Sequence, residues 1–268
     1  MSALQEIVAR KRERLARAKM SAPLERIREA AHVKRSFTSS HRLVEALKRD
    51  AVNVIAEFKR KSPSKGMIRS DVGAAAMAQS YEAGGAVAIS VLTEEDYFSG
   101  SLDDLQQVKS AVRLPVLRKD FLFEEYQIYE SAAAGADAIL LIVASLEDKQ
   151  LSDLRRLAED ELGLDALVEV HDEGELERAE ASGARLIGVN NRNLHTFEVS
   201  LNTSLRLASR PSPDATLISE SGLHDARDLS KLRALGYRGF LIGELLMRAG
   251  NAEDVLRELR SAGQVVIS

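Results

Sequence analysis

Short apolar runs alternate with amphipathic segments along most of the chain. The first run, Val52–Ala56, ends at Glu57 and Lys59 and then opens into a loop of Lys, Ser, Pro and Gly. A short apolar run bounded by turn residues is typical of a strand buried on both faces, as in parallel sheets. The pattern recurs and predicts eight strands, at Val52–Ala56, Ala86–Leu92, Pro115–Arg118, Ala138–Val143, Ala166–Val170, Leu186–Val189, Thr216–Ser219 and Phe240–Ile242.

Helical periodicity fills the intervals between these strands. The predicted helices are Val72–Ala83, Leu102–Val112, Glu124–Ala134, Leu146–Leu162, Glu173–Ser182, Thr203–Ser209, His224–Leu235 and Glu253–Ala262. Several of them end in a glycine suited to a left-handed cap, namely Gly84-Gly85, Gly135, Gly183 and Gly236. Eight βα units of roughly 27 residues each predict an α/β fold, a (β/α)₈ TIM barrel. A doubly wound open sheet is the alternative, but it would want a glycine-rich phosphate turn after its first strand, where this chain has Ser-Pro-Ser-Lys-Gly.

Residues 1–50 differ from the rest because they show helical spacing and no strand. We therefore expect a single domain over 1–268, with an N-terminal helical extension over 1–50 and eight βα units over 51–268. The last helix of the extension is expected to follow a cap at Ser39-Ser40. The basic run Arg10–Arg14 is interpreted as the solvated face of an amphipathic helix, in preference to an RNA or membrane contact.

Composition narrows the function classes. Hydrophobic residues at 45% and charged residues at 29% are ordinary values for a folded globular protein. The absence of cysteine excludes disulfides, thiolate zinc sites and cysteine nucleophiles, and a net charge of −4 argues against a nucleic-acid binder. No apolar run approaches about 20 residues, and charges interrupt the N-terminal stretch throughout. We expect a cytoplasmic protein without a membrane segment.

Charged and amide side chains fall where the predicted strands end. They are Glu57 and Lys59, Lys119 and Asp120, Glu169, Asn190 and Arg192, and Glu220 and Ser221. In a barrel these strand ends converge on one rim. Any one of these residues could be an ordinary strand-end charge. Several Lys and Glu side chains at one mouth, however, indicate an ion-pair network or acid–base chemistry.

Glycines follow the last two predicted strands, at Gly222 and Gly243. Barrels commonly bind phosphate at this position through backbone N–H groups, and a side chain there would hold the oxyanion away from the amides. Ser62 and Ser64 have no histidine near them in the sequence, so we interpret them as hydroxyls of a phosphate loop and not as nucleophiles. The pattern predicts a phosphorylated small-molecule ligand.

The histidines and aromatic residues are less informative. His171, His195 and His224 lack the spacing of metal ligands, so no metal site is expected and they are interpreted as solvated loop histidines. The segment Phe121–Phe123 would suit either packing at a helix start or an apolar pocket for an aromatic ligand. Phe58 and Leu194 leave the same two alternatives open.

Six segments carry a resemblance to a known family. IAEFKRKSPSKG, LRKDF, LVEVH, IGVNNRNL, ISESG and LIGELLM occur in this order and extend from the first predicted strand to the eighth. Together they resemble indole-3-glycerol phosphate synthase, a barrel enzyme of tryptophan biosynthesis. The helical N-terminal segment also looks like the extension that this family packs over the barrel mouth.

The resemblance implies a substrate, 1-(2-carboxyphenylamino)-1-deoxyribulose 5-phosphate, that is closed to an indole with loss of carbon dioxide and water. Lys119 matches the family's general acid for ring closure, and Lys59 matches the ammonium that holds the substrate carboxylate and joins later proton transfers. Glu169 and Glu57 match the acidic pair around the anilino nitrogen and the departing hydroxyl. The residues that match groups orienting the intermediate are Asn190 and Ser221.

On the same resemblance, Ser62, Gly222 and Gly243 fall on the phosphate positions. The other residues expected to bind substrate or phosphate are Arg192, Glu220, Glu244 and Phe121. Many family members have a serine where this chain has Leu245. We expect little effect, because the phosphate contacts at this strand should be backbone amides.

Decarboxylation restores the aromaticity that ring closure removes, so no electron-sink cofactor is expected. The expected partner is a small-molecule sugar phosphate, and the chain is expected to be a monomer. Two other readings stay open at this point. One is a different sugar-phosphate barrel, such as an Amadori isomerase or a Schiff-base aldolase. The other is a catalytically inactive barrel that serves as a binding protein.

Overall fold

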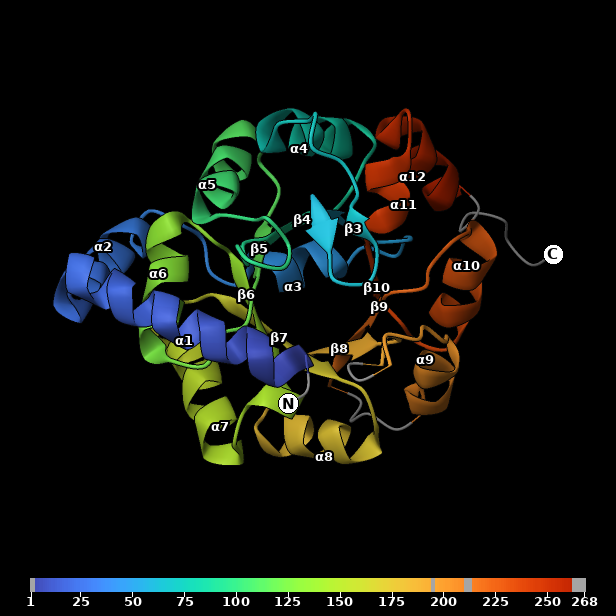
Figure 1. Ribbon diagram of the computed structural model, residues 1–268. Helices are drawn as coiled ribbons and strands as arrows, with labels where there is room; N and C mark the ends of the chain where they lie inside the picture. The colour runs from blue at the N-terminus through green and yellow to red at the C-terminus, as the bar shows by residue number, and fades with distance from the viewer. Residues whose placement is uncertain (1–2, 194–195, 210–213, 262–268) are drawn as a thin grey trace.

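The computed structural model describes residues 3–193, 196–209 and 214–261. Eight parallel strands form a closed barrel in the order β1-β10-β9-β8-β7-β6-β5-β4 (Figure 1). These strands are β1 (Val54–Phe58), β4 (Ala88–Leu92), β5 (Val116–Lys119), β6 (Ala138–Ile142), β7 (Asp165–Val170), β8 (Leu186–Asn190), β9 (Thr216–Glu220) and β10 (Gly239–Ile242). The predicted TIM barrel is confirmed.

Helices surround the barrel and alternate with its strands. They are α4 (Ala74–Ala83), α5 (Leu102–Ala111), α6 (Glu125–Ala134), α7 (Asp148–Arg156), α8 (Glu173–Ala181), α9 (Asn202–Leu207), α10 (Ala226–Ala234) and α12 (Ala252–Ser261). A 3₁₀ turn, η1 (Val143–Ser145), precedes α7, and a π-helical segment, η2 (Leu157–Glu161), follows it. Gly135 ends α6 in the predicted left-handed conformation, with φ +93°. Ala262, the predicted end of the last helix, lies outside the described residues.

The sequence did not predict two short elements at the barrel mouth. The loop after β1 forms a small antiparallel hairpin of β2 (Lys61–Ser62) and β3 (Gly66–Met67). A short helix, α11 (Glu244–Arg248), follows β10 directly. None of the described helices is long and apolar enough to cross a membrane.

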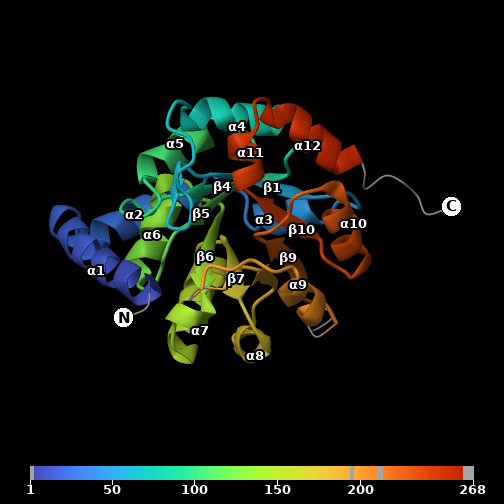
Figure 2. The same cartoon turned by 45° about the vertical axis from the view of Figure 1, so that its right-hand side comes forward.

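Three helices precede the barrel in the described part of the chain, where the sequence predicted a helical extension. Helix α2 (Leu24–Arg35) packs against α6, and α1 (Ala3–Ser21) lies along the rim beside α6 (Figures 1 and 2). Helix α3 (Arg42–Leu47) lies at the opposite end, behind the barrel centre in Figure 1. Its Leu43 and Leu47 are buried in the same apolar cluster as the inward-facing strand residues. Helix α3 therefore closes the bottom of the barrel.

The predicted cap of α3 at Ser39-Ser40 is wrong. The helix begins at Arg42 after His41, which adopts a left-handed backbone with φ 53° and makes no capping bond with its side chain. The backbone N–H groups of Leu43 and Val44, in the first turn of the helix, donate to Oδ2 of Asp165 at 2.8 and 3.2 Å. Because this acceptor comes from the start of β7, far away in the sequence, local pattern could not reveal it.

Inward-facing residues of alternate strands form layers. Ile55, Leu117, Leu167 and Ile218 belong to one buried apolar cluster inside the barrel. Side chains two residues apart on a strand share a face, so the next layer toward the mouth consists of Glu57, Lys119, Glu169 and Glu220. Strands β1 and β5 extend beyond their predicted ends because Glu57 and Lys119 are part of the strands. From the sequence, the strands were expected to end before these polar residues, whereas they are the strand residues that form the charged layer.

We expect Asp165→Ala to lower the free energy of unfolding by about 2 kcal/mol, because it removes the shared acceptor of two helix N–H groups at a buried site. Chemical denaturation of the purified variant measures this loss. Asp225→Ala is the matched control, since Asp225 caps α10 in the same way from an exposed position. If Asp165→Ala lost no more unfolding free energy than Asp225→Ala, the role of Asp165 as the buried cap of α3 would be contradicted.

Candidate active site

The carboxyl ends of the strands open into a cavity of about 710 Å³. Every residue that the sequence singled out for catalysis or binding lines it: Glu57, Lys59, Ser62, Lys119, Phe121, Glu169, Asn190, Arg192, Glu220, Ser221, Gly222, Gly243 and Glu244. They come from loops and strand ends far apart in the chain, and closure of the barrel brings them together. Their position at one mouth is thus confirmed, whereas their individual roles stay predictions.

Lys119 lies at the centre of an ion-pair cluster. Its Nζ is 2.6 Å from Oε2 of Glu220 and 3.2 Å from Oε2 of Glu169. Both carboxylates are almost fully buried, and the lysine side chain is 14% exposed on the cavity side. Beside it, Nζ of Lys59 is 2.6 Å from Oε1 of Glu57. This cluster therefore combines the ammonium groups of Lys119 and Lys59 with the carboxyl groups of Glu57, Glu169 and Glu220.

The protonation of this cluster follows from burial and from the balance of charges. Burial opposes the charge on Lys119, but Glu220, Glu169 and Glu57 outweigh it and raise the pKa of the lysine. Burial also favours the neutral form of Glu169, but Lys119, His171 and a hydrogen bond from Asn190 lower the pKa of that carboxyl. Glu220 responds in the opposite way: burial, with repulsion from Glu169 and Glu57, raises its pKa to about 7 despite Lys119.

Two glycines make room for the buried carboxylates. A Cβ at Gly188 would lie 2.2 Å from Oε1 of Glu220, and one at Gly243 would lie 2.3 Å from Oε1 of Glu57. From the sequence, Gly243 was expected to let backbone amides approach a phosphate. The structure gives a second and independent reason, since any side chain there would displace Glu57.

The loops after β8 and β9 close one side of the mouth. Asn190 accepts the N–H of Arg192 at 3.0 Å, and Nη1 of Arg192 reaches across the mouth to Oγ of Ser64, at 3.3 Å. Ser221 and Gly222 both have positive φ, 66° and 75°. A serine in the left-handed region is uncommon, and such backbone strain concentrates at functional sites.

The end of the cavity predicted to hold phosphate combines three segments. Ser62 lies buried in the hairpin after β1, Gly222 follows β9, and Gly243 precedes α11. The side chain of Glu244 pairs with Arg248 at 3.0 Å. Leu245, which departs from the family pattern, also lines this cavity.

An aromatic wall faces the charged cluster. Phe121 lines the cavity, and the ring of Phe98, from the loop after β4, lies 6.4 Å from it between centroids. Phe98 was missed because its loop shows no pattern that distinguishes it. Phe123 and Phe58 are buried in the core between barrel and helices, so the packing alternative is the correct one for both. Leu194 lies outside the described residues.

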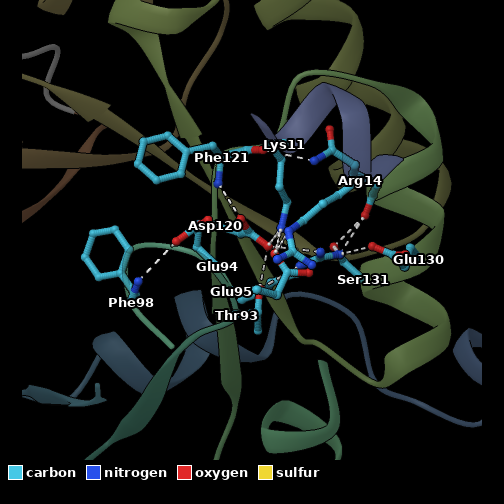
Figure 3. A network of polar contacts seen from close by, with 12 residues as sticks. Lys11, Arg14, Thr93, Glu94, Glu95, Phe98, Asp120, Phe121, Glu130 and Ser131 are labelled. Carbon is cyan, nitrogen blue, oxygen red and sulfur yellow. Dashed lines mark hydrogen bonds and ion pairs between the residues drawn. The ribbon is translucent and has the colours of Figure 1, made fainter. Parts of the chain in front are cut away.

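Helix α1 is tied to this wall by a buried network (Figure 3). Lys11 pairs with Asp120 at 2.7 Å and with Glu95 at 3.0 Å. The carboxylate of Asp120 also accepts the hydroxyl of Thr93, at 2.6 Å, and the backbone N–H of Phe121, at 2.9 Å. The network thus fixes the residue that follows Lys119 and the backbone of an aromatic wall residue.

The interpretation of Arg10–Arg14 as a solvated face is therefore wrong for part of the run. Lys11 is buried, and Arg14 makes two hydrogen bonds to Asp96. The signal was present in the sequence, because Lys11 falls between Ile7 and Leu15 at helical spacing and so lies on the buried face of α1.

The interpretation of His171 as a solvated loop histidine is also wrong. Its Nδ1 lies 3.0 Å from Oε2 of Glu175, its Nε2 lies 3.4 Å from Oε1 of Glu169, and its side chain is 14% exposed. His224 is exposed, as expected, and His195 lies outside the described residues. Within the described ranges, no group of three or more His, Asp or Glu side chains is placed to hold a metal ion.

Comparison with solved structures supports the fold alone. The thiamine phosphate pyrophosphorylase from Pyrococcus furiosus superposes with a TM-score of 0.61 at 14% identity, over 81% of this chain and 98% of that one. The 3-hexulose-6-phosphate synthase from Salmonella typhimurium gives a TM-score of 0.63 at 11% identity, over 79% and 98%. Both identities are too low to transfer a function.

Sequence comparison is more specific. An indole-3-glycerol phosphate synthase from Desulfosudis oleivorans is 47% identical over 259 residues, which cover 96% of this chain and 97% of the relative. One from Desulfotalea psychrophila is 49% identical over 259 residues, with the same coverage. The family model described as indole-3-glycerol phosphate synthase matches residues 4–259. The chain belongs to the indole-3-glycerol phosphate synthase family.

Proposed function

We propose that the protein catalyses the reaction for which its family is named, in tryptophan biosynthesis. It closes 1-(2-carboxyphenylamino)-1-deoxyribulose 5-phosphate to indole-3-glycerol phosphate and releases carbon dioxide and water. The observation that carries the proposal is the buried ammonium of Lys119 between Glu169 and Glu220, facing a cavity with an aromatic wall. An acid held among bases in this way suits a reaction of successive proton transfers.

Lys119 acts as the general acid of ring closure. As the aromatic carbon attacks the ketone carbon, the Lys119 ammonium gives a proton to the ketone oxygen, which becomes a hydroxyl. The flanking carboxylates keep the lysine protonated in the free enzyme. Carbon dioxide then leaves, and its bonding electrons restore the aromatic ring.

Dehydration completes the indole and needs both an acid and a base. The hydroxyl leaves as water after it takes up a proton, and a base removes the remaining proton from the new ring. Glu169 and Glu57 are the carboxylates placed for these steps, and Lys59 is held beside Glu57 at 2.6 Å. Asn190 and Ser221 orient the intermediate.

The lining of the cavity suggests how the substrate is placed. Its aromatic ring packs against Phe121 and Phe98, and Lys59 and Arg192 receive the carboxylate. The phosphate lies at the opposite end, against Ser62 and the backbone of Gly222 and Gly243. Glu244 lies next to Gly243 at this end, whereas Glu220 contacts the substrate from its position beside Lys119. Two experiments separate this reaction from the other sugar-phosphate barrels considered from the sequence. An Amadori isomerase would release no carbon dioxide, and a Schiff-base aldolase would be trapped by borohydride in the presence of substrate.

We further propose a cytoplasmic monomer that acts without nucleic acid. A single barrel supplies every proposed catalytic residue, so the site needs no second copy of the chain. The net charge of −4 supports action without nucleic acid, and the biosynthetic reaction proposed above supports the cytoplasmic location.

Lys119→Ala and Glu169→Gln should each lower kcat by about 10²–10⁴, because each removes one general acid–base group. Indole fluorescence and released carbon dioxide measure turnover, and circular dichroism verifies the fold. Lys149→Ala is the control, since Lys149 is an exposed lysine whose ion pair with Asp153 lies on α7. Wild-type turnover in either active-site variant would refute its assignment.

Glu220 should make stability depend on pH. Its pKa of about 7 lies above the ordinary 4.5, so between these values the folded state holds a proton that the unfolded state has lost. This contribution to stability is complete below about pH 4.5 and disappears as pH rises through about 7. The unfolding free energy of Glu220→Gln minus that of the wild type should therefore increase by about 1–3 kcal/mol over this window. Urea denaturation of both proteins at several pH values measures this difference. A difference that does not change with pH would contradict the raised pKa of Glu220.

A further inference from the structure

Two carboxylates share Lys119 but differ on their other oxygen. Glu169 and Glu220 both present Oε2 to the lysine, at 3.2 and 2.6 Å. On the far side, Oε1 of Glu169 lies 3.4 Å from Nε2 of His171, which is an ion-pair contact and not a hydrogen bond. Oε1 of Glu220 is buried and has no hydrogen-bond partner among the described residues. The surroundings of the two carboxylates therefore differ by this imidazole and by the hydrogen bond from Asn190 to Glu169.

Glu175 determines how that imidazole is oriented. Its Oε2 accepts both the backbone N–H of His171, at 2.8 Å, and the ring Nδ1–H, at 3.0 Å. With Nδ1 bonded to a carboxylate, the other ring nitrogen points at Glu169. The arrangement runs from the first turn of α8 through the end of β7 to the cavity, and neither His171 nor Glu175 lines the cavity itself.

We propose that His171, held by Glu175, is a positioning residue that decides which carboxylate beside Lys119 is ionised. It keeps Glu169 as the carboxylate and leaves Glu220 to hold the proton. Pairs of carboxyl groups whose surroundings differ in this way take opposite acid and base roles in many active sites. The proposal rests on the function proposed above for Glu169 and adds a division of labour to it.

The electrostatics of the free protein agree with this geometry. The charged groups around the imidazole are Glu169 on β7, Glu175 on α8 and Glu220 on β9, with Lys119 behind Glu169. Burial alone would lower the pKa of His171, but these three carboxylates raise it. The raised pKa favours the protonated form of the imidazole beside Glu169.

The test is the pH profile of kcat for His171→Gln and Glu175→Gln. Loss of the cation beside Glu169 should move the acidic limb of the His171→Gln profile upward by about one pH unit. KM should change less than about twofold, because His171 does not touch the cavity. Glu175→Gln should shift the limb in the same direction by less. A limb that stays at its wild-type position, or a loss of kcat that is uniform with pH, would overturn the proposal.

A matched control and a direct measurement complete the design. His41→Gln removes a second histidine that pairs with a buried acid, Asp165, at the bottom of the barrel, and should leave the profile unchanged. Carbon-13 NMR of labelled glutamate carboxyls, assigned with Glu169→Gln and Glu220→Gln, should show a higher pKa for Glu169 in His171→Gln. An unchanged Glu169 titration would contradict the inference.

Different results would refute the catalytic role of Glu169 and the positioning role of His171. Wild-type turnover in Glu169→Gln would remove the proposed catalytic role of Glu169 itself. An inactive Glu169→Gln together with a wild-type profile in His171→Gln would refute only the role of His171.

Discussion

Four side chains at the top layer of the barrel share one small and largely buried volume, and three of the four carry a carboxyl group. Closure of the barrel leaves Glu57, Glu169 and Glu220 no way to separate, and in such surroundings their repulsion is much stronger than in water. The single lysine of this layer, Lys119, offsets part of it. Several neighbouring groups reduce the repulsion that remains between the carboxyl groups. Lys59 takes one carboxylate, His171 takes another, and two glycines give the carboxyl groups room.

The end of β5 serves two networks because strand residues alternate between faces. Lys119 points into the barrel, toward Glu169 and Glu220. Its neighbours Arg118 and Asp120 pair with each other at 3.1 Å on the other face, and Asp120 also holds Lys11 of α1 (Figure 3). The N-terminal extension is therefore anchored one residue away from the proposed general acid. Its charged side chains contribute to the order of the mouth as well as covering it.

Much of the architecture could be read from the sequence because its signals are local and repeated. Strand and helix periodicity, with glycines at helix ends, was enough for eight βα units. The polar strand ends were enough to place the mouth. What failed depended on contacts between distant segments. Asp165 replaces the expected serine cap of α3, and the partner of Lys11 lies more than a hundred residues away.

His171 shows a further limit of sequence reasoning. In the sequence, His171 was interpreted only through its spacing to the other histidines. The informative spacing was instead to carboxylates, with Glu169 two residues before it and Glu175 four residues after it. Phe98 carried no signal at all, since its position in the aromatic wall depends on how the loop after β4 folds.

Strand β7 connects the two ends of the barrel over a very short distance. Asp165 at its start caps the helix that closes the bottom, and Glu169 near its end faces Lys119. Leu167 lies between them in the apolar layer. A gain or loss of one residue inside this strand would turn the side chains beyond it to the opposite face. Evolution can therefore lengthen or shorten this chain in its loops, whereas the length of β7 is fixed by both ends at once.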